Sequence, residues 1–250
     1  MQRLFPEPAA DLDPPTIYDA LWRELPLPPH DRPYVLLNMV TSVDGKAALA
    51  GGAAGIGSAT DHRLMRALRA ATDATMIGAA TLRAERVDPR VGAERAAARV
   101  TRGVPPEPLA VVISGGGDLP LDRRYFAHAE VPRVVLLGAA ATPERRAALA
   151  ARARVFVAPT PQPEPAWALG VLRRECGVRH LLVEGGPTLN GALLAADLVD
   201  ELCWTLAPKI VGGGESLTLV AGSPLPEPRR LHLRSAYLHE DEFFLRYRLA

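Results

Sequence analysis

Hydrophobic residues gather in short runs that alternate with stretches of helical periodicity along most of the chain. Short runs rich in Val, Leu and Ile, bounded by turn residues, are typical of buried strands. They predict strands at 34–40, 74–78, 109–114, 134–137, 155–158, 180–184 and 202–207. Two further runs, at 231–238 and 242–249, lie on either side of a short polar turn and predict an antiparallel pair.

Helix-start signals fall between these strands. Ser58 stands three residues before Asp61, as in a capping box, and Thr142 precedes Pro143 as an N-cap precedes the first helical residue. Pro187 marks a further helix start. The signals and the apolar spacing predict helices beginning near 58, 79 and 142, a helix over 169–175 and one from 187 to about 196. This alternation predicts an α/β fold with a mixed, mainly parallel sheet flanked by helices.

Proline suggests how the chain is divided. The chain has 24 Pro among its 250 residues, and a cluster of them in 1–33 breaks any long helix there, leaving room for a short one at 16–25. We interpret 1–33 as a Pro-rich N-terminal arm lying over the surface. The remaining segment, 34–250, is interpreted as a single domain, since its length suits one large unit.

Composition narrows the class of protein. Hydrophobic residues make up 48% and charged residues 23%, which suits a packed core. The net charge is +1 and the arginines are scattered, so no nucleic-acid partner is expected, although a local group of arginines could bind an anionic substrate. Two cysteines, Cys176 and Cys203, are too few for a disulfide framework or a four-ligand zinc site, and no metal is expected. No apolar run approaches the roughly 18 residues of a membrane span, so we expect a cytoplasmic protein with no membrane partner.

Candidate chemistry lies in four loops that follow predicted strands, because ligands of open α/β sheets bind at strand carboxyl ends. The loops are 41–46, 51–58, 78–85 and 183–191. The first is more often an ordinary turn. The second holds Gly55, Gly57 and Thr60 in a spacing near a dinucleotide fingerprint, but no strand leads directly into it, so it is interpreted as a loop that exposes backbone. The third is either a phosphate-ready helix start or a plain tight turn.

The loop at 183–191 is the most informative of the four. Glu184 ends an apolar strand, Gly185 and Gly186 permit close backbone approach, and Pro187 starts a helix. One interpretation places the Glu184 carboxylate beside a bound ligand. The alternative is a structural glutamate that pairs with an arginine. Both interpretations stay open on the sequence.

Taken together, the loops resemble the reductase domain of bacterial bifunctional riboflavin-biosynthesis deaminase/reductase proteins, in its free-standing form. The resemblance is carried by NMVTSVDGK at 38–46, by LRA at 68–70 through to Gly78 and Thr81, by VEGGPTL at 183–189, by LVDEL at 198–202 and by APKIVG at 207–212. This family is similar to dihydrofolate reductase in fold. The His-x-Glu and Pro-Cys-x-x-Cys signature of the deaminases is missing from the chain.

The resemblance implies a cofactor, a substrate and an assembly. NADPH would contact one set of residues: Thr41, Gly78, Thr81, Ser114, Gly185, Gly186, Pro187, Thr188 and Leu189. A phosphoribosyl-aminopyrimidine would contact another: Asp44, Ser58, Arg69, Glu85 and Glu184. Hydride transfer to C1 of the opened ribose would give a ribityl chain, with Glu184 and Asn38 as the catalytic residues. Family members commonly form homodimers, and 198–212 is the candidate contact.

The chain also departs from the biosynthetic pattern, mainly in the substrate half. Those members usually carry Lys where Asn38 stands, and an aromatic residue where Gly55 stands. Their Thr-then-Asp-Asp-Pro pattern is replaced by TLRAERVDP at 81–89. Two alternatives therefore accompany the first interpretation. One is a related NADPH reductase of another heterocyclic or carbonyl substrate, and the other is a non-catalytic nucleotide-binding protein.

Overall fold

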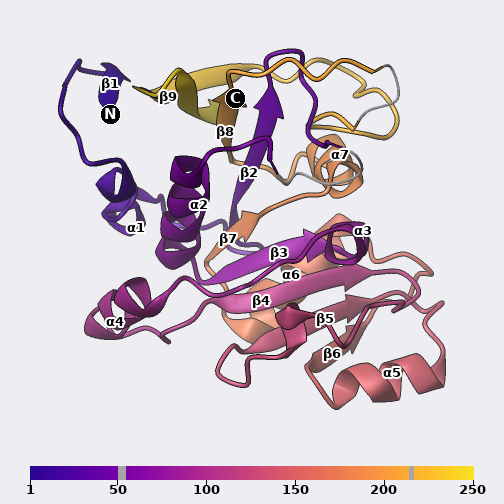
Figure 1. Ribbon diagram of the computed structural model, residues 1–250. Coiled ribbons are helices and arrows are strands. Elements are labelled where there is room, and N and C mark those ends of the chain that lie inside the picture. The colour runs from indigo at the N-terminus through magenta and orange to yellow at the C-terminus, as the bar shows by residue number, and fades with distance from the viewer. Residues whose placement is uncertain (50–54, 214–216) are drawn as a thin grey trace.

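The computed structural model describes residues 1–49, 55–213 and 217–250, and these build one ten-stranded sheet flanked by helices (Figure 1). The strand order is β1-β9-β10-β8-β2-β7-β3-β4-β5-β6. The bounds of the strands are β1 Gln2–Phe5, β2 Tyr34–Ser42, β3 Ala74–Gly78, β4 Leu109–Ser114, β5 Arg133–Leu137, β6 Arg154–Val157, β7 His180–Val183, β8 Glu201–Ala207, β9 Leu231–His239 and β10 Glu242–Leu249.

The helices fall between the strands much as their start signals predict. Ser58 caps the helix that follows it, because its hydroxyl accepts hydrogen bonds from the backbone N–H groups of Thr60 and Asp61. Thr142 caps the helix that begins at Pro143 in the same way. The bounds are α1 Leu21–Glu24, α2 Ala59–Ala71, α3 Ala79–Ala84, α4 Ala93–Thr101, α5 Pro143–Ala150, α6 Pro165–Cys176 and α7 Pro187–Ala195, with short 3-10 turns η1 at Pro14–Thr16 and η2 at Arg124–Phe126.

Strand pairing confirms the mixed, mainly parallel sheet. Every pair from β8 through β2, β7, β3, β4 and β5 to β6 is parallel, whereas β10 runs antiparallel to both β8 and β9. The central strands are apolar along their length because helices cover both of their faces. Along β10, buried and half-buried positions alternate instead, as on a strand with one packed face.

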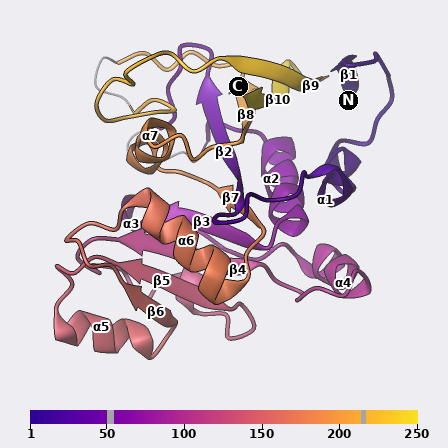
Figure 2. The same ribbon diagram turned by 180° about the vertical axis from the view of Figure 1, so that it is seen from behind.

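Helices cover the two faces of the sheet in an order that the connections dictate. The chain steps outward from β2 to β6, then returns to place β7 between β2 and β3. Right-handed crossovers therefore put the later helices on the opposite face from the earlier ones. Helix α6 lies behind the sheet in Figure 1 and in front of it in Figure 2. Its Leu169 and Leu172 share one core cluster with Leu193 of α7, while Leu68 of α2 and Leu149 of α5 belong to two other clusters.

The N-terminal segment takes part in the sheet and the core. Strand β1 pairs antiparallel with β9, and Tyr18 and Leu21 are buried in the cluster that α2 covers. The interpretation of 1–33 as an arm lying over the surface therefore omitted these contacts. Helix α4 was also missed, because its one buried side chain is Arg99 rather than an apolar residue. The guanidinium of Arg99 donates to the carbonyls of Ala70, Thr72 and Pro105.

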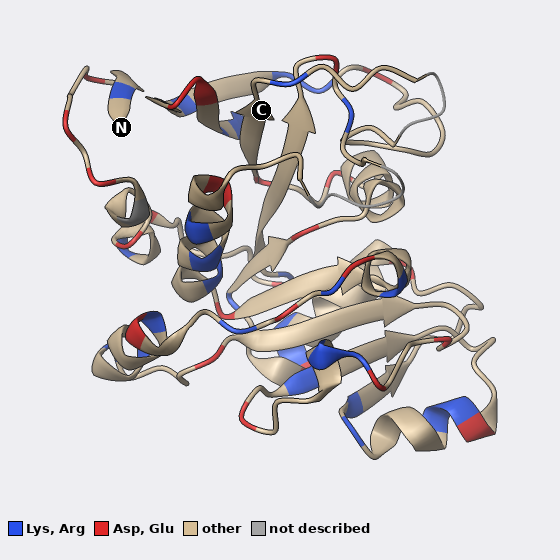
Figure 3. Cartoon of the chain, in the orientation of Figure 1, with Lys and Arg blue, Asp and Glu red and all other residues tan. Residues whose placement is uncertain are grey.

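Charged residues of both signs are interspersed over the helices and loops (Figure 3). Over the described ranges, no helix combines the length and apolarity needed to cross a membrane.

Candidate active site

The carboxyl ends of β2, β7 and β3 meet at one edge of the sheet, beside the point where the strand order reverses. Backbone hydrogen bonds join two of these ends: Gly78 N–H donates to the Gly185 carbonyl at 2.8 Å, and Glu184 N–H donates to the Met76 carbonyl at 2.9 Å. The Gly185–Gly186 peptide is cis. This edge is where open α/β sheets bind ligands.

Neighbouring side chains approach the backbone closely at Gly185 and Gly186. A Cβ on Gly186 would come within 3.0 Å of Oγ1 of Thr81. A Cβ on Gly185, whose φ is +82°, would come within 3.0 Å of Sδ of Met39. Gly78 lies against the backbone nitrogen of Gly186, at 3.6 Å from its own would-be Cβ. The structure therefore brings together Gly78, Thr81 and the Gly185–Gly186 turn, which the resemblance assigned to the cofactor.

Helix α7 presents an uncapped N-terminus at the same junction. Gly186 is its N-cap and makes no side-chain cap, since glycine has no side chain, and Thr188 is exposed there. Pro187 has no N–H, so the unpaired donors are those of Thr188 and Leu189. Such donors, together with the positive end of the helix dipole, suit an anionic group such as a phosphate.

Two of the predicted cofactor residues use their hydroxyls within the protein. Thr41 is 1% exposed, and its Oγ1 accepts a hydrogen bond from Nε1 of Trp204 at 2.9 Å. Ser114 is 7% exposed, and its Oγ accepts from the backbone N–H of Gly117 at 3.0 Å. Both residues lie near strand ends, but each hydroxyl is hydrogen-bonded to a group of the protein itself in this structure.

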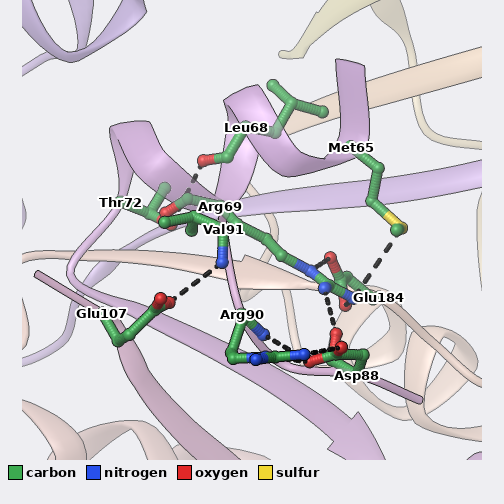
Figure 4. A network of polar contacts seen from close by, with 9 residues as sticks. All are labelled: Met65, Leu68, Arg69, Thr72, Asp88, Arg90, Val91, Glu107 and Glu184. Atoms are coloured by element: carbon green, nitrogen blue, oxygen red, sulfur yellow. Dashed lines mark hydrogen bonds and ion pairs between the residues drawn. The ribbon is translucent and has the colours of Figure 1, made fainter. Parts of the chain in front are cut away.

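Glu184 and Arg69 form a buried, two-pronged ion pair (Figure 4). Nε of Arg69 donates to Oε1 at 2.6 Å and Nη2 donates to Oε2 at 2.8 Å, with side chains 4% and 10% exposed. Burial opposes the charge of Arg69, but the Glu184 carboxylate more than offsets it and raises the pKa of Arg69 above its ordinary value. Glu184 thus pairs with an arginine in this structure, as one of the two interpretations of its sequence expected.

A short segment, Asp88–Val91, folds over this ion pair. The Asp88 carbonyl accepts from Nη1 of Arg69 at 2.6 Å, and Val91 N–H donates to Glu107 at 2.9 Å. Hydrogen bonds from Arg90 hold the pKa of the Asp88 carboxyl down at about 2. Beside the segment lies an open pocket of about 450 Å³, lined by charged residues of both signs: Arg66, Asp88, Arg90, Glu107, Arg124 and Glu130.

Three predicted substrate residues hold the chain's own loops or helix ends. The Ser58 hydroxyl caps α2 and donates to Glu242, which also accepts from Ser58 N–H at 3.2 Å. Asp44 accepts from the Ser42 hydroxyl at 2.6 Å and from the N–H groups of Val211 and Gly212, and these bonds, the Ser42 one foremost, lower the pKa of its carboxyl to about 2. Glu85 is the C-cap of α3 and donates its N–H to the Thr81 carbonyl.

Asn38 and Asp61 share a small cavity between α2 and the sheet, and Asp61 was missed as a site residue. Asp61 is 9% exposed, and burial raises the pKa of its carboxyl to about 6 despite a hydrogen bond with Thr205; the Glu242 charge adds to the rise. The cavity has room for about one water molecule. The sequence showed Asp61 only as an acid in a helix first turn, and its burial depends on β8 and β10, which come far later in the chain.

Part of the second predicted loop, 51–54, lies outside the described residues; of the rest, Ile56 is fully buried and Ser58 is the α2 cap. Within the described residues, no cluster of His, Cys, Asp and Glu is arranged to hold a metal ion.

Comparison with known proteins shows which family this chain is similar to. The RibD C-terminal domain family matches residues 33–242. The 2,5-diamino-6-ribosylamino-4(3H)-pyrimidinone 5′-phosphate reductase of Methanothermobacter thermautotrophicus is 36% identical over 219 residues, covering 86% of this chain and 98% of that protein. RibD of Mycobacterium tuberculosis is 31% identical over 72% of this chain and 44% of its own length.

Among solved structures, a pyrimidine reductase-like protein from Corynebacterium diphtheriae superposes with a TM-score of 0.80 at 25% identity, covering 93% of this chain and 98% of that chain. The chain belongs to the RibD C-terminal domain family. The predicted dihydrofolate-reductase-like fold class is confirmed.

Proposed function

We propose that this protein is an NADPH-dependent reductase of riboflavin biosynthesis that transfers a hydride to C1 of the ribose of a ribosylaminopyrimidine 5′-phosphate. The substrate would be of the 5-amino-6-(phosphoribosylamino)uracil type or its diaminopyrimidinone relative. The similarity over 86% of this chain to a protein named as the reductase of the diaminopyrimidinone substrate supports the proposal. The observation that carries it is the junction of Gly78, Thr81 and the Gly185–Gly186 turn at the uncapped start of α7.

The residues at this junction fit a nicotinamide dinucleotide. The first-turn N–H groups of α7 suit a phosphate of the cofactor, and the tight glycine backbone leaves the strand edge open to a flat ring. Thr41 and Ser114, at neighbouring strand ends, complete the proposed cofactor side. A bound nicotinamide would supply the hydride, while the protein aligns the two reactants and excludes water.

On the substrate side, Glu184 and Asn38 are the proposed catalytic residues. The Glu184 carboxylate, held in one orientation by Arg69, is suited to accept a hydrogen bond from a ribose hydroxyl. Arg69 is the proposed partner of the substrate phosphate, and Asp44, Ser58 and Glu85 are the proposed residues around it. Because Arg69 is engaged by Glu184 and Asp88, phosphate binding would require part of this network to rearrange.

Two observations favour a second candidate, a related reductase of another heterocyclic or carbonyl substrate. Position 38 is a neutral Asn, and Asp88–Val91 closes over Arg69. The third hypothesis, a nucleotide-binding protein without catalytic turnover, predicts that NADPH binds but is not oxidised. We further propose a cytoplasmic homodimer in which 198–212 contributes to the contact, and light scattering of the purified protein tests the dimer.

Oxidation of NADPH, followed by its absorbance with each of the two ribosylaminopyrimidine phosphates, tests the proposed activity. The expected product is two hydrogens heavier than the substrate by mass spectrometry. Turnover only with another carbonyl compound would favour the second candidate. Binding of NADPH without its oxidation by any of the substrates tested would favour the hypothesis of a non-catalytic nucleotide-binding protein.

A further inference from the structure

Asp61 is held in place by the start of α2. Ser58 is the N-cap of this helix, and both its N–H and its hydroxyl donate hydrogen bonds to Glu242 of β10. These bonds tie the first turn of α2 to the sheet. The Asp61 carboxyl then lies against Gly57, where any Cβ would come within 2.2 Å of its Oδ2. The glycine thus leaves the space that the carboxyl occupies.

The same residue lines a small cavity together with two other polar residues. Asn38 of β2 and Thr205 of β8 line the cavity together with Asp61. Thr205 is hydrogen-bonded to Asp61, and the half-buried Asn38 lines the same cavity. A polar amide and a carboxyl that share a space for about one water molecule are suited to a water or to a polar atom of a ligand.

Glu184 is a poor source of a proton. Both of its oxygens accept hydrogen bonds from the Arg69 guanidinium, so neither oxygen is free to act on a substrate nitrogen without breaking that pair. A reduction that adds a hydride also needs a proton, and a fully paired carboxylate has none to give.

We propose that Asp61 is the catalytic acid that donates the proton accompanying hydride transfer. This role rests on the reductase function proposed above. The hydride adds to C1 of the opened ribosylamine, and the electron pair of the C=N bond moves to nitrogen. The nitrogen takes the proton from the Asp61 carboxyl, directly or through one water beside Asn38. The resulting carboxylate regains a proton from solvent, so one NADPH and one proton are consumed per turnover.

The surroundings of Asp61 support this role. Burial raises the pKa of the Asp61 carboxyl to about 6, which is close to the pH range in which a general acid operates. The polar and titratable groups that face Asp61 or line its cavity come from every element around it: Glu242 on β10, Glu184 beside β7, Thr205 and Cys203 on β8, Asn38 on β2, Tyr18 of the N-terminal segment and His62 on α2 itself. The two glutamates raise the pKa of Asp61, while Thr205 and His62 lower it.

The test compares wild-type protein with Asp61→Asn and with Asp19→Asn as the matched control. Asp19 is also an aspartate whose pKa is raised by burial, but it pairs with Arg95 and does not line the cavity. Single-turnover NADPH oxidation with the diaminopyrimidinone substrate is measured across pH 5–9, beside a carbon-13 NMR titration of the aspartate carboxyls without ligand. We expect Asp61→Asn to slow turnover about a hundredfold or more and to flatten the pH profile. Its spectrum should also lack one carboxyl that titrates near pH 6.

Thr205→Val gives a second, independent readout. Removing the hydroxyl removes a hydrogen bond that lowers the pKa of Asp61, so the alkaline fall in wild-type turnover should move to higher pH. Turnover of Asp61→Asn at the wild-type rate, or an unmoved pH profile in Thr205→Val, would overturn the role of Asp61 alone. A wild-type protein that never oxidises NADPH with the pyrimidines overturns the proposed function and this role together.

Discussion

Replacing Glu184 by Gln should destabilise the folded protein, because it removes the negative charge from a buried pair. Arg69 is 3% exposed and cannot reach water to recover its solvation. Breaking a buried pair by removing one partner costs about 3–5 kcal/mol. The Gln amide oxygen can still accept from Arg69, and the Asp88 carbonyl still accepts from Nη1, so the lower end of this range applies.

For a chain of this length, about 3 kcal/mol corresponds to a fall in Tm of roughly 6–12 °C. A thermal melt at neutral pH with urea unfolding measures the loss. Glu175→Gln is the matched control, since Glu175 pairs with Arg154 on the surface, where the side chains are 53% and 55% exposed. Such an exposed pair contributes about 1 kcal/mol or less.

A double variant separates the unpaired charge from other effects. If the loss in Glu184→Gln comes from a buried guanidinium without its counter-charge, adding Arg69→Met should recover part of it. A melt of Glu184→Gln within about 2 °C of wild type would refute the reasoning, as would a double variant less stable than both single ones. Either result would mean that Arg69 finds other compensation in the folded protein.

Three further outcomes are expected. Gly186→Val should abolish NADPH binding in a folded protein, because its side chain would press on Thr81 and fill the cofactor edge; retained binding by fluorescence titration places the cofactor elsewhere. NADPH should bind about tenfold or more tightly than NADH, since the exposed guanidinium of Arg83, which donates to the Asp118 carbonyl four residues after Ser114, can meet a 2′-phosphate, and equal affinities would contradict this. Between pH 3.8 and about 6 the folded protein keeps a proton on Asp61 that the unfolded chain has released, so stability should fall by about 3 kcal/mol as pH rises, and urea titrations of Asp61→Asn should lack this slope.

Much of the fold could be predicted because its central strands are apolar on both faces and its helix starts carry explicit caps. Ser58, Thr142 and Pro187 each begin a helix where the sequence placed one. The exceptions were elements that tertiary contacts stabilise. Strand β1 is short and depends on pairing with β9, and α4 is anchored by Arg99 through carbonyls of distant loops.

The site was less predictable, because its contacts join residues far apart in the chain. The glycines of the 185–186 turn and Thr81 could be chosen from local sequence, since tight turns and helix starts have local signatures. The pairing of Arg69 with Glu184 spans 115 positions and exists only because β7 is inserted beside β2 and β3. Local sequence offered both residues for the substrate and could not show that they bind each other.

The neutral residue at position 38 bears on the protonation of Asp61, because the two residues line the same cavity. The resemblance to biosynthetic reductases leads one to expect a lysine at position 38, and an ammonium lining the same cavity would favour the ionised form of Asp61. In this chain the position is neutral, while Glu242 and Glu184 place negative charge near the carboxyl. Arg69, on the same helix as Asp61, is already matched by Glu184. Asp61 therefore keeps its proton to a higher pH than an ordinary aspartate, up to about pH 6, and a neutral residue at position 38 preserves a group able to give a proton.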